Sequence, residues 1–291
     1  MWKIHAGSGT AEPGRYGRAV LPLICLDVDG TLVGSAGVPA PETWAAAEAA
    51  RARGQRLTLC TARLAAGPTR DWAARLDPDG WHVFHTGAAR WHPATGEVRV
   101  VALPDDAVEA CRAVAAERGW VLEVYSWDDY VTNSDDPLAV GHAGLLDLPY
   151  RRRPVSDLAE QVVRVQFVVP IAEAEAALAA APAGLAASGA TSPAMPGAAF
   201  VSITAAGVSK ASGVAAVAGD LGVDLAEVMM VGDGHNDLSA VAAVGWGVAM
   251  GNADPVLLAA ARLVVADVDA GGAAEAIERA ATLARAVPEA R

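Results

Sequence analysis

Apolar and polar positions alternate in blocks along the chain. Short apolar runs of strand length are followed by Ala-rich stretches of helical length, which is typical of βα units around a parallel sheet. The N-terminal block predicts a strand, a helix and a strand over 21–27, 41–54 and 55–60. The C-terminal block predicts four helices alternating with three strands. The helices are expected over 208–222, 236–245, 254–263 and from about 272, and the strands over 227–233, 246–250 and 263–267. Pro41 and Ser209 are suited to helix N-termini.

The middle of the chain has a different pattern. It predicts a hairpin over 91–103, a helix over 104–119 and a strand over 120–127. A long polar loop follows, then a strand over 161–170 and an Ala/Gly/Pro-rich run over 176–197, where we expect a helix followed by a turn. Because the βα pattern stops here and later resumes, we interpret the middle as an insertion into one α/β core.

Composition and charge narrow the class of protein. Of the 291 residues, 53% are hydrophobic, which excludes a disordered chain, and the net charge of −12 argues against general electrostatic binding of nucleic acid. Three separated cysteines favour neither a zinc site nor a disulfide framework. We expect residues 1–20 to form a loose leader, and we expect a cytoplasmic protein that does not bind a membrane.

The first chemical signal is a pair of aspartates after the first predicted strand, Asp27 and Asp29, followed by Gly30-Thr31. Ligand-binding groups in open α/β sheets gather at the carboxyl ends of the strands. One carboxylate can attack phosphorus while the other exchanges a proton with the leaving oxygen and then with water.

The second signal, Gly232 to Asp237, follows another apolar strand. Carboxylates from two strand ends would make a site of oxygen ligands suited to Mg²⁺, with Asp233 as the expected direct ligand. Thr61, at the end of the second strand, and Lys210, beside the cap Ser209, could each face a phosphate oxygen at the same sheet edge.

In this order, Asp27/Asp29, Thr61, Lys210 and Asp233/Asp237 resemble the four motifs of the haloacid dehalogenase-like (HAD) superfamily, and the segments GVSKASGV, GDGHND and VAMGNADPVLLAAARLVV resemble its Cof-like branch. The resemblance implies a Rossmann-like parallel-sheet core with an inserted α/β cap. We therefore expect the core over 21–85 and 200–291, and over 86–199 a cap that sets substrate specificity.

The resemblance also implies roles for the motif residues. Asp27 would be the nucleophile that forms an aspartyl-phosphate, and Asp29 the general acid/base. The Mg²⁺ ligands would be Asp27, the backbone carbonyl of Asp29, and Asp233, with Asp237 supporting them. Thr61 and Lys210 would bind the phosphate, and Asn236 would either contact the phosphate or orient Lys210. Two departures from the family pattern stand out: Ala62 replaces a glycine in the second motif, and Thr86 replaces an asparagine at the entrance to the cap.

The resemblance implies a Mg²⁺-dependent phosphatase that hydrolyses a small phosphorylated metabolite, with sugar phosphates as the leading class. Pyridoxal phosphate, nucleotides and mannosyl-phosphoglycerate stay open as other classes. Two alternative functions are a sugar phosphomutase and a non-catalytic ligand-sensing protein with the same fold. We expect a monomer or a small homo-oligomer.

Overall fold

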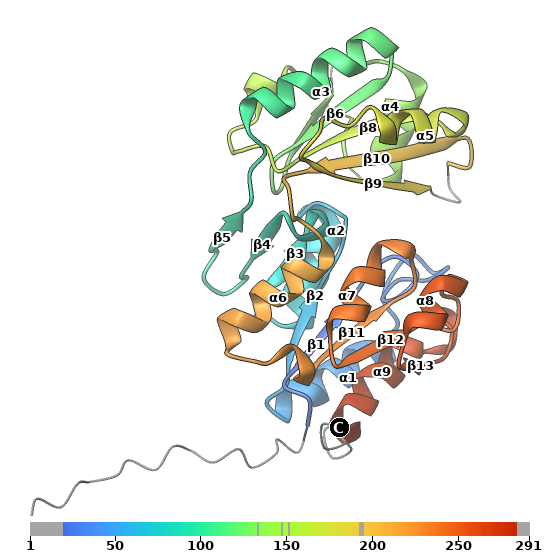
Figure 1. Cartoon of the computed structure of the whole chain (residues 1–291). Helices are drawn as coiled ribbons and strands as arrows, with labels where there is room; N and C mark the ends of the chain where they lie inside the picture. Colours follow the sequence, from blue (N-terminus) through green and yellow to red (C-terminus); the bar gives the residue numbers. More distant parts are fainter. Residues whose placement is uncertain (1–19, 133, 147, 151, 192–194, 284–291) are drawn as a thin grey trace, which may run out of the picture.

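The computed structural model describes residues 20–132, 134–146, 148–150, 152–191 and 195–283. The predicted leader therefore lies outside the described residues, apart from its last residue. Two α/β units are stacked on each other, with both chain ends of the described part at the lower unit (Figure 1). Across the described ranges, every helix is too short or too polar to cross a lipid bilayer.

The lower unit, here called the core, contains a parallel five-stranded sheet, as the sequence predicted. Its order is β13-β12-β11-β1-β2. The strands are β1 (Leu23–Leu26), β2 (Arg56–Leu59), β11 (Val228–Gly232), β12 (Trp246–Ala249) and β13 (Leu263–Val264). The core helices are α1 (Pro41–Ala52), α2 (Gly67–Leu76), α6 (Lys210–Leu221), α7 (Leu238–Ala243), α8 (Pro255–Ala260) and α9 (Gly272–Leu283).

The strand order places two distant segments of the chain side by side. β1 pairs with β11 in a register that sets Leu26 beside Val231, and the Asp27 amide donates to the Val231 carbonyl at 3.0 Å. Both strands are completely buried, so their polar groups emerge only at the carboxyl ends. The fold thus brings the first and last predicted motifs to one edge.

A small antiparallel sheet of β3 (His82–Phe84), β4 (Ala89–Trp91) and β5 (Val98–Val100) adjoins the core. It contains the predicted hairpin. Its side chains belong to the same hydrophobic cluster as the central sheet, including Phe84 and Trp91. The sequence predicted that the insertion begins at residue 86, but the structure keeps β4 and β5 with the core, because the apolar side chains of β4 are buried there and the half-buried Val98 and Val100 of β5 pack against the same cluster.

The upper unit, here called the cap, is an antiparallel sheet of order β7-β6-β8-β10-β9. The strands are β6 (Val121–Tyr125), β7 (Tyr130–Thr132), β8 (Arg164–Pro170), β9 (Ala186–Thr191) and β10 (Ala198–Thr204). Helices α3 (Asp105–Arg118) and α5 (Ala174–Ala179) cover one face, and α4 (Pro137–Leu145) packs on the other. The cap sheet extends to Thr204, beyond the predicted limit of 199, because β10 pairs with both β8 and β9.

One prediction within the cap was wrong and a second was incomplete. The polar loop predicted after residue 127 contains β7 and α4. The run over 176–197 contains the end of the helix α5, in agreement with the predicted helix, but also the edge strand β9, which was not predicted. Ala, Gly and Ser have low strand propensity, so β9 exists because its backbone pairs with β10. Only the tertiary pairing makes this segment a strand.

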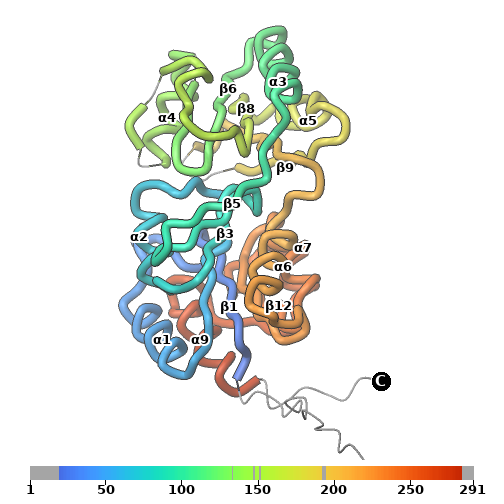
Figure 2. The backbone as a smooth tube through the Cα atoms, turned by 90° about the vertical axis from the view of Figure 1, so that its left-hand side faces the viewer, coloured from blue at the N-terminus to red at the C-terminus, as the bar shows by residue number. Residues whose placement is uncertain are grey.

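The chain crosses between the units twice, after β5 and before α6, as Figure 2 shows. Ala88, Val163 and Val208 form a small apolar cluster at these crossings. Further bonds join the units beside the second motif. The Arg164 guanidinium donates to the Ala62 carbonyl at 2.6 Å, and the Ala65 amide donates to the Trp127 carbonyl at 3.0 Å. The cap is therefore attached directly to the loop that follows β2.

Candidate active site

Asp27 and Asp29 follow β1 but differ in environment. The strand delivers Asp27 to the sheet edge, where only 4% of the residue is exposed. Asp29 lies in the following turn, with 64% of its side chain exposed. Gly30 continues the turn with φ of +75°, and a Cβ there would lie 2.1 Å from Asp233 Oδ2. Glycine at this position lets the β1 turn approach the β11 end closely.

Lys210 connects the motifs. It is the first residue of α6, whose N-terminus is closed by a capping box of Ser209 and Ser212. Its side chain is completely buried, and Nζ lies 2.6 Å from Asp27 Oδ1 and 2.6 Å from Asp237 Oδ1. The chain has two lysines, and all its other cationic residues are arginines. A compact ammonium can bridge two buried carboxylates where a planar guanidinium would need more room.

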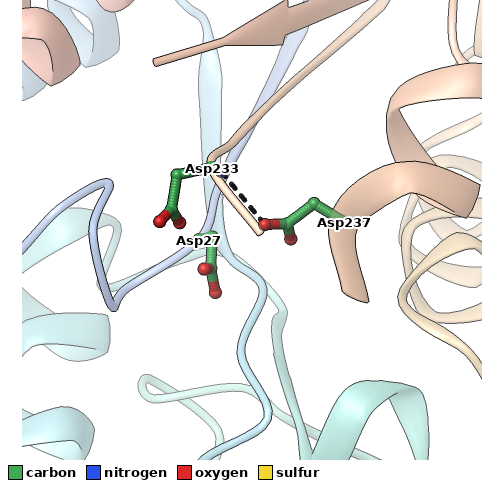
Figure 3. A group of neighbouring side chains, drawn as sticks. All are labelled: Asp27, Asp233 and Asp237. Atoms are coloured by element: carbon green, nitrogen blue, oxygen red, sulfur yellow. Dashed lines mark hydrogen bonds between the residues drawn. The ribbon is translucent and has the colours of Figure 1, made fainter. Parts of the chain in front are cut away.

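Asp233 and Asp237 complete the cluster from the end of β11 (Figure 3). Asp237 is completely buried, and its Oδ2 accepts from the amides of Asp233 at 3.2 Å and Gly234 at 3.1 Å. A Cβ on Gly232 would lie 2.4 Å from Asp237 Cγ. The turn is thus built around the Asp237 carboxylate, which leaves Asp233 to face Asp27.

Negative charge exceeds positive charge in this cluster. Oxygens of Asp27, Asp233 and Asp237 lie within 4.8 Å of one another around the single ammonium of Lys210. Burial, and then the charge of Asp237, raise the pKa of Asp27 well above its ordinary value although Lys210 opposes the shift. The same two causes raise the pKa of Asp233 to about 7. Burial alone would lower the pKa of Lys210, but the two carboxylates outweigh it and raise that pKa.

The arrangement fits a divalent cation. Asp27 Oδ1 accepts from Lys210 and Asp233 Oδ1 accepts from Thr31 at 3.3 Å. No hydrogen bond from the described residues reaches the Oδ2 atoms of these two aspartates. Crowded carboxylates with raised pKa values and unused oxygens are suited to hard cations such as Mg²⁺. Asp237, whose two oxygens are already engaged, supports this pair.

The Asp29 carboxylate is bonded to the guanidinium of Arg63, a residue that the sequence analysis did not assign to the site. Arg63 holds the carboxylate through two bonds, Nε to Oδ2 at 3.0 Å and Nη2 to Oδ1 at 2.6 Å. The signal was available in the sequence, since Arg63 lies two residues after Thr61 in the second motif. Two parallel bonds fix the orientation of the Asp29 carboxylate.

Thr61 and Asn236 differ in how closely the structure engages them. Thr61 is completely buried, its amide donates to the Val83 carbonyl at 3.0 Å, and its Oγ1 accepts from the Arg63 amide at 3.1 Å. Thr61 can therefore bind a ligand by donating a hydrogen bond from its hydroxyl group. Asn236 is exposed, and within the described residues no hydrogen bond joins it to Lys210.

The cluster opens into a cavity of about 620 Å³ between core and cap. Asp27, Asp29, Asp233 and Asn236 line its core side, and His142 and Phe200 lie on its cap side. The sequence analysis did not find His142, because it lies on α4, which was predicted as loop. The available signal was Asp136-Pro137: the Asp136 side chain caps α4 by accepting from the Leu138 amide at 2.8 Å, and Pro137 is its first residue.

Comparison with known proteins identifies the family to which this chain is similar. The model of the haloacid dehalogenase-like hydrolase family matches residues 24–277. YxeH, a candidate phosphatase of Bacillus subtilis (strain 168), is 26% identical over 262 residues, covering 88% of this chain and 96% of YxeH.

Solved structures share the fold over nearly the whole chain. BT1666, a phosphatase of the haloalkanoate enzyme superfamily from Bacteroides thetaiotaomicron, has a TM-score of 0.77 and 25% identity, covering 95% of this chain and 100% of that protein. The subclass IIB sugar phosphatase BT4131 has a TM-score of 0.74 and 25% identity, covering 88% of this chain and 98% of that protein.

Proposed function

The chain belongs to the haloacid dehalogenase-like hydrolase family, and we propose that it is a Mg²⁺-dependent phosphatase. Its substrate is a small phosphomonoester of the sugar-phosphate class, and the reaction passes through an aspartyl-phosphate on Asp27. The sugar-phosphate class is supported by the likeness to BT4131, which is described as a sugar phosphatase.

One observation carries the proposal: Lys210 Nζ bridges Asp27 and Asp237 at 2.6 Å each, with Asp233 beside them at the floor of the cavity. A carboxylate approaching a phosphate dianion is repelled unless positive charge lies between them. Lys210 lies where it can neutralise both the nucleophile and an incoming phosphoryl oxygen.

In the first half-reaction, an Asp27 oxygen attacks phosphorus and the bond from phosphorus to the leaving oxygen breaks. Asp29 enters this step as the protonated acid and donates its proton to that oxygen, so that an alcohol leaves and Asp29 becomes a carboxylate. The bidentate contact with Arg63 keeps Asp29 at the mouth of the site, so Asp29 exchanges this contact for the leaving oxygen when substrate binds. Thr61 and Lys210 hold phosphoryl oxygens, and Asn236 contacts them from the cavity wall.

In the second half-reaction, water attacks phosphorus, the bond from phosphorus to the Asp27 oxygen breaks, and Asp29 accepts the proton of the water. The products are inorganic phosphate and free Asp27. Asp27, the Asp29 carbonyl and Asp233 would hold Mg²⁺, with Asp237 supporting them. When bound, the ion supplies charge neutralisation and in-line orientation for the phosphoryl group.

The cap, here residues from about 102 to 204, closes the cavity above this edge and sets substrate specificity. It is fastened to the second motif by the Arg164 bond to the Ala62 carbonyl. Cap position and phosphate binding are thereby coupled.

The test is turnover of p-nitrophenyl phosphate and of a panel of sugar phosphates. We expect release of inorganic phosphate that EDTA abolishes and Mg²⁺ restores, and we expect Asp27→Asn to abolish it. Asp224→Asn is the matched control: Asp224 caps a short turn remote from the cavity, and asparagine caps equally well. Retained activity in Asp27→Asn would exclude Asp27 as nucleophile, and isomerised sugar phosphate without free phosphate would indicate a mutase.

A further inference from the structure

The cap side of the cavity is mostly apolar. It is formed by His142, Leu145, Leu146, Ala190, Thr191 and Phe200, together with Gly189. Of the described cap residues that line the cavity, His142 and Thr191 have polar side chains, and His142 is the only one that can titrate. A hydrogen-bonding group in an apolar wall restricts which ligands can be bound well.

His142 is held by a buried carboxylate. Glu123, on β6, is completely buried, and His142 Nδ1 lies 2.8 Å and 2.9 Å from its two oxygens. The Tyr125 hydroxyl donates to the same carboxylate at 2.5 Å and the Gln166 amide donates to it at 3.1 Å. On its other side the ring packs against Phe200, with ring centroids 4.6 Å apart. The imidazole therefore has both its position and its plane fixed.

These contacts decide which nitrogen faces the cavity. The Glu123 carboxylate already accepts from two other donors, so His142 Nδ1 carries a proton and donates to it. This leaves Nε2 as the remaining polar atom of a ring that lines the cavity, and among the described residues nothing bonds to it. A fixed tautomer with one unused nitrogen is prepared for a ligand.

We propose that His142 is a specificity-determining residue that binds a hydroxyl of the leaving group through Nε2, with Glu123 as its positioning residue. The inference rests on the proposed phosphatase function, and it specifies that the cap binds the leaving group of the substrate. The ligand class is a phosphate ester with a hydroxylated leaving group, whose C–H surface packs on Leu145, Leu146 and Phe200.

Two substitutions of His142 separate recognition from structural support. Asparagine places its amide near the Nδ1 position and keeps the bond to Glu123, but it has no group at the Nε2 position. Glutamine reaches the Nε2 position and gives up the bond to Glu123. If His142 has only a structural role, His142→Asn should have the substrate preference of the wild type. If Nε2 recognises the substrate, His142→Gln should keep more of the wild-type substrate preference than His142→Asn does.

The measured quantity is the ratio of kcat/KM for hydroxylated esters (glucose 6-phosphate, mannose 6-phosphate and ribose 5-phosphate) to kcat/KM for p-nitrophenyl phosphate, which has no hydroxyl. We expect His142→Asn to lower the best of these ratios by about 10- to 100-fold, because a buried hydrogen-bond partner is lost. His92→Asn, the same substitution outside the cavity, should leave the ratio unchanged. A ratio in His142→Asn equal to that of the wild type would overturn the proposal.

Glu123→Gln tests the positioning role. We expect a higher KM for the preferred hydroxylated ester with little change in kcat, and a double variant Glu123→Gln/His142→Asn no worse than His142→Asn alone. Additive losses would show that Glu123 acts independently of His142.

The outcomes separate this proposal from the function on which it rests. A wild-type protein that hydrolyses none of these esters contradicts the proposed function. A wild-type protein that hydrolyses p-nitrophenyl phosphate but prefers no hydroxylated ester contradicts the role of His142 and the sugar-phosphate class, and leaves the phosphatase activity itself in place.

Discussion

The core side and the cap side of the cavity differ in the kind of side chain that lines them. The core side consists of charged groups near the ends of buried parallel strands. Lys210 bonds to Asp27 and to Asp237, and an oxygen of Asp233 lies within 4.8 Å of both carboxylates. The cap side consists of side chains on the face of an antiparallel sheet and one helix. These are mainly apolar, with His142 as the titratable group.

The difference indicates where change is tolerated. Each core group is bonded to another, so a substitution leaves a buried charge without its partner and damages the whole cluster. A cap side chain mainly contacts its neighbours in the wall, so its replacement changes which ligand fits and leaves the charged cluster intact. Chemistry and recognition are thus assigned to different units, and the comparison can be tested in each.

The largest effect is expected from Lys210→Met on the core side. The substitution keeps an unbranched side chain but leaves three crowded carboxylates without an ammonium. We expect kcat to fall by about 100- to 1000-fold at saturating Mg²⁺, in line with the loss of one preorganised electrostatic group. The check is steady-state kinetics on p-nitrophenyl phosphate, with circular dichroism to verify folding. A decrease in kcat of less than tenfold would contradict the assignment of the chemistry to the charged core side.

The core should also be sensitive to acid. His82 is completely buried and joins β2 to β3, with Nδ1 accepting from the Leu59 amide at 3.1 Å. Burial lowers the pKa of His82 from 6.5 to about 4. As the pH falls through 6.5 the unfolded chain takes up a proton first, so stability is complete above that value and is lost toward pH 4. The shift corresponds to roughly 3 kcal/mol.

Urea unfolding between pH 7.5 and pH 4 measures this loss. His82→Gln is neutral over the whole range, so its unfolding free energy should fall less steeply than that of the wild type. Parallel slopes for the two proteins would show that His82 does not limit acid stability.

At the junction, Arg164→Met should produce a smaller loss. Arg164 is 4% exposed, donates to the Ala62 carbonyl and lies over the Tyr125 ring at 3.9 Å. Methionine keeps the packing of the stem but not the bond. We expect a decrease of about 1.5 kcal/mol in the unfolding free energy, with KM and kcat both altered.

Arg112→Met is the matched control on the outer surface of the cap. Arg112 is 52% exposed and pairs with Glu109 on the same helix. An exposed pair of this kind contributes little to stability, because water screens it and two long side chains must be ordered to form it. Equal losses in the two variants would show that the Arg164 bond does not couple the units.

The smallest effect should come from Thr86→Asn, a stabilisation. Thr86 lies in the left-handed region, with φ of +58° and ψ of +23°, beside His85 at φ of +50°. Threonine is disfavoured there and asparagine is tolerated. We expect a gain of about 0.5–1 kcal/mol in thermal or urea unfolding. Thr282→Asn, in the helical backbone of α9, should be neutral because the two residues have similar helix propensities. A destabilised Thr86→Asn would contradict this interpretation.

The core was predictable because its pattern is local and repeated. Each apolar run is long enough for one strand, and the motif aspartates directly follow such runs, so the parallel sheet and the site residues at its edge could be inferred together. In the cap the same reasoning failed for β9, whose small residues become a strand only by pairing with β10. It failed also for α4, because Asp136-Pro137 is equally consistent with a turn and with a helix start.

The sequence by itself determined the α/β class, the order of the motifs and the residues that meet at the sheet edge, because parallel strands must present their carboxyl ends together. Tertiary structure decided what no local pattern contains: that one ammonium joins Asp27 to Asp237, that Arg63 holds Asp29, and that β4 and β5 belong to the core. It also decided that Glu123 presents His142 to the cavity. These contacts join residues from separate elements, and burial and charge select them only once the elements have packed.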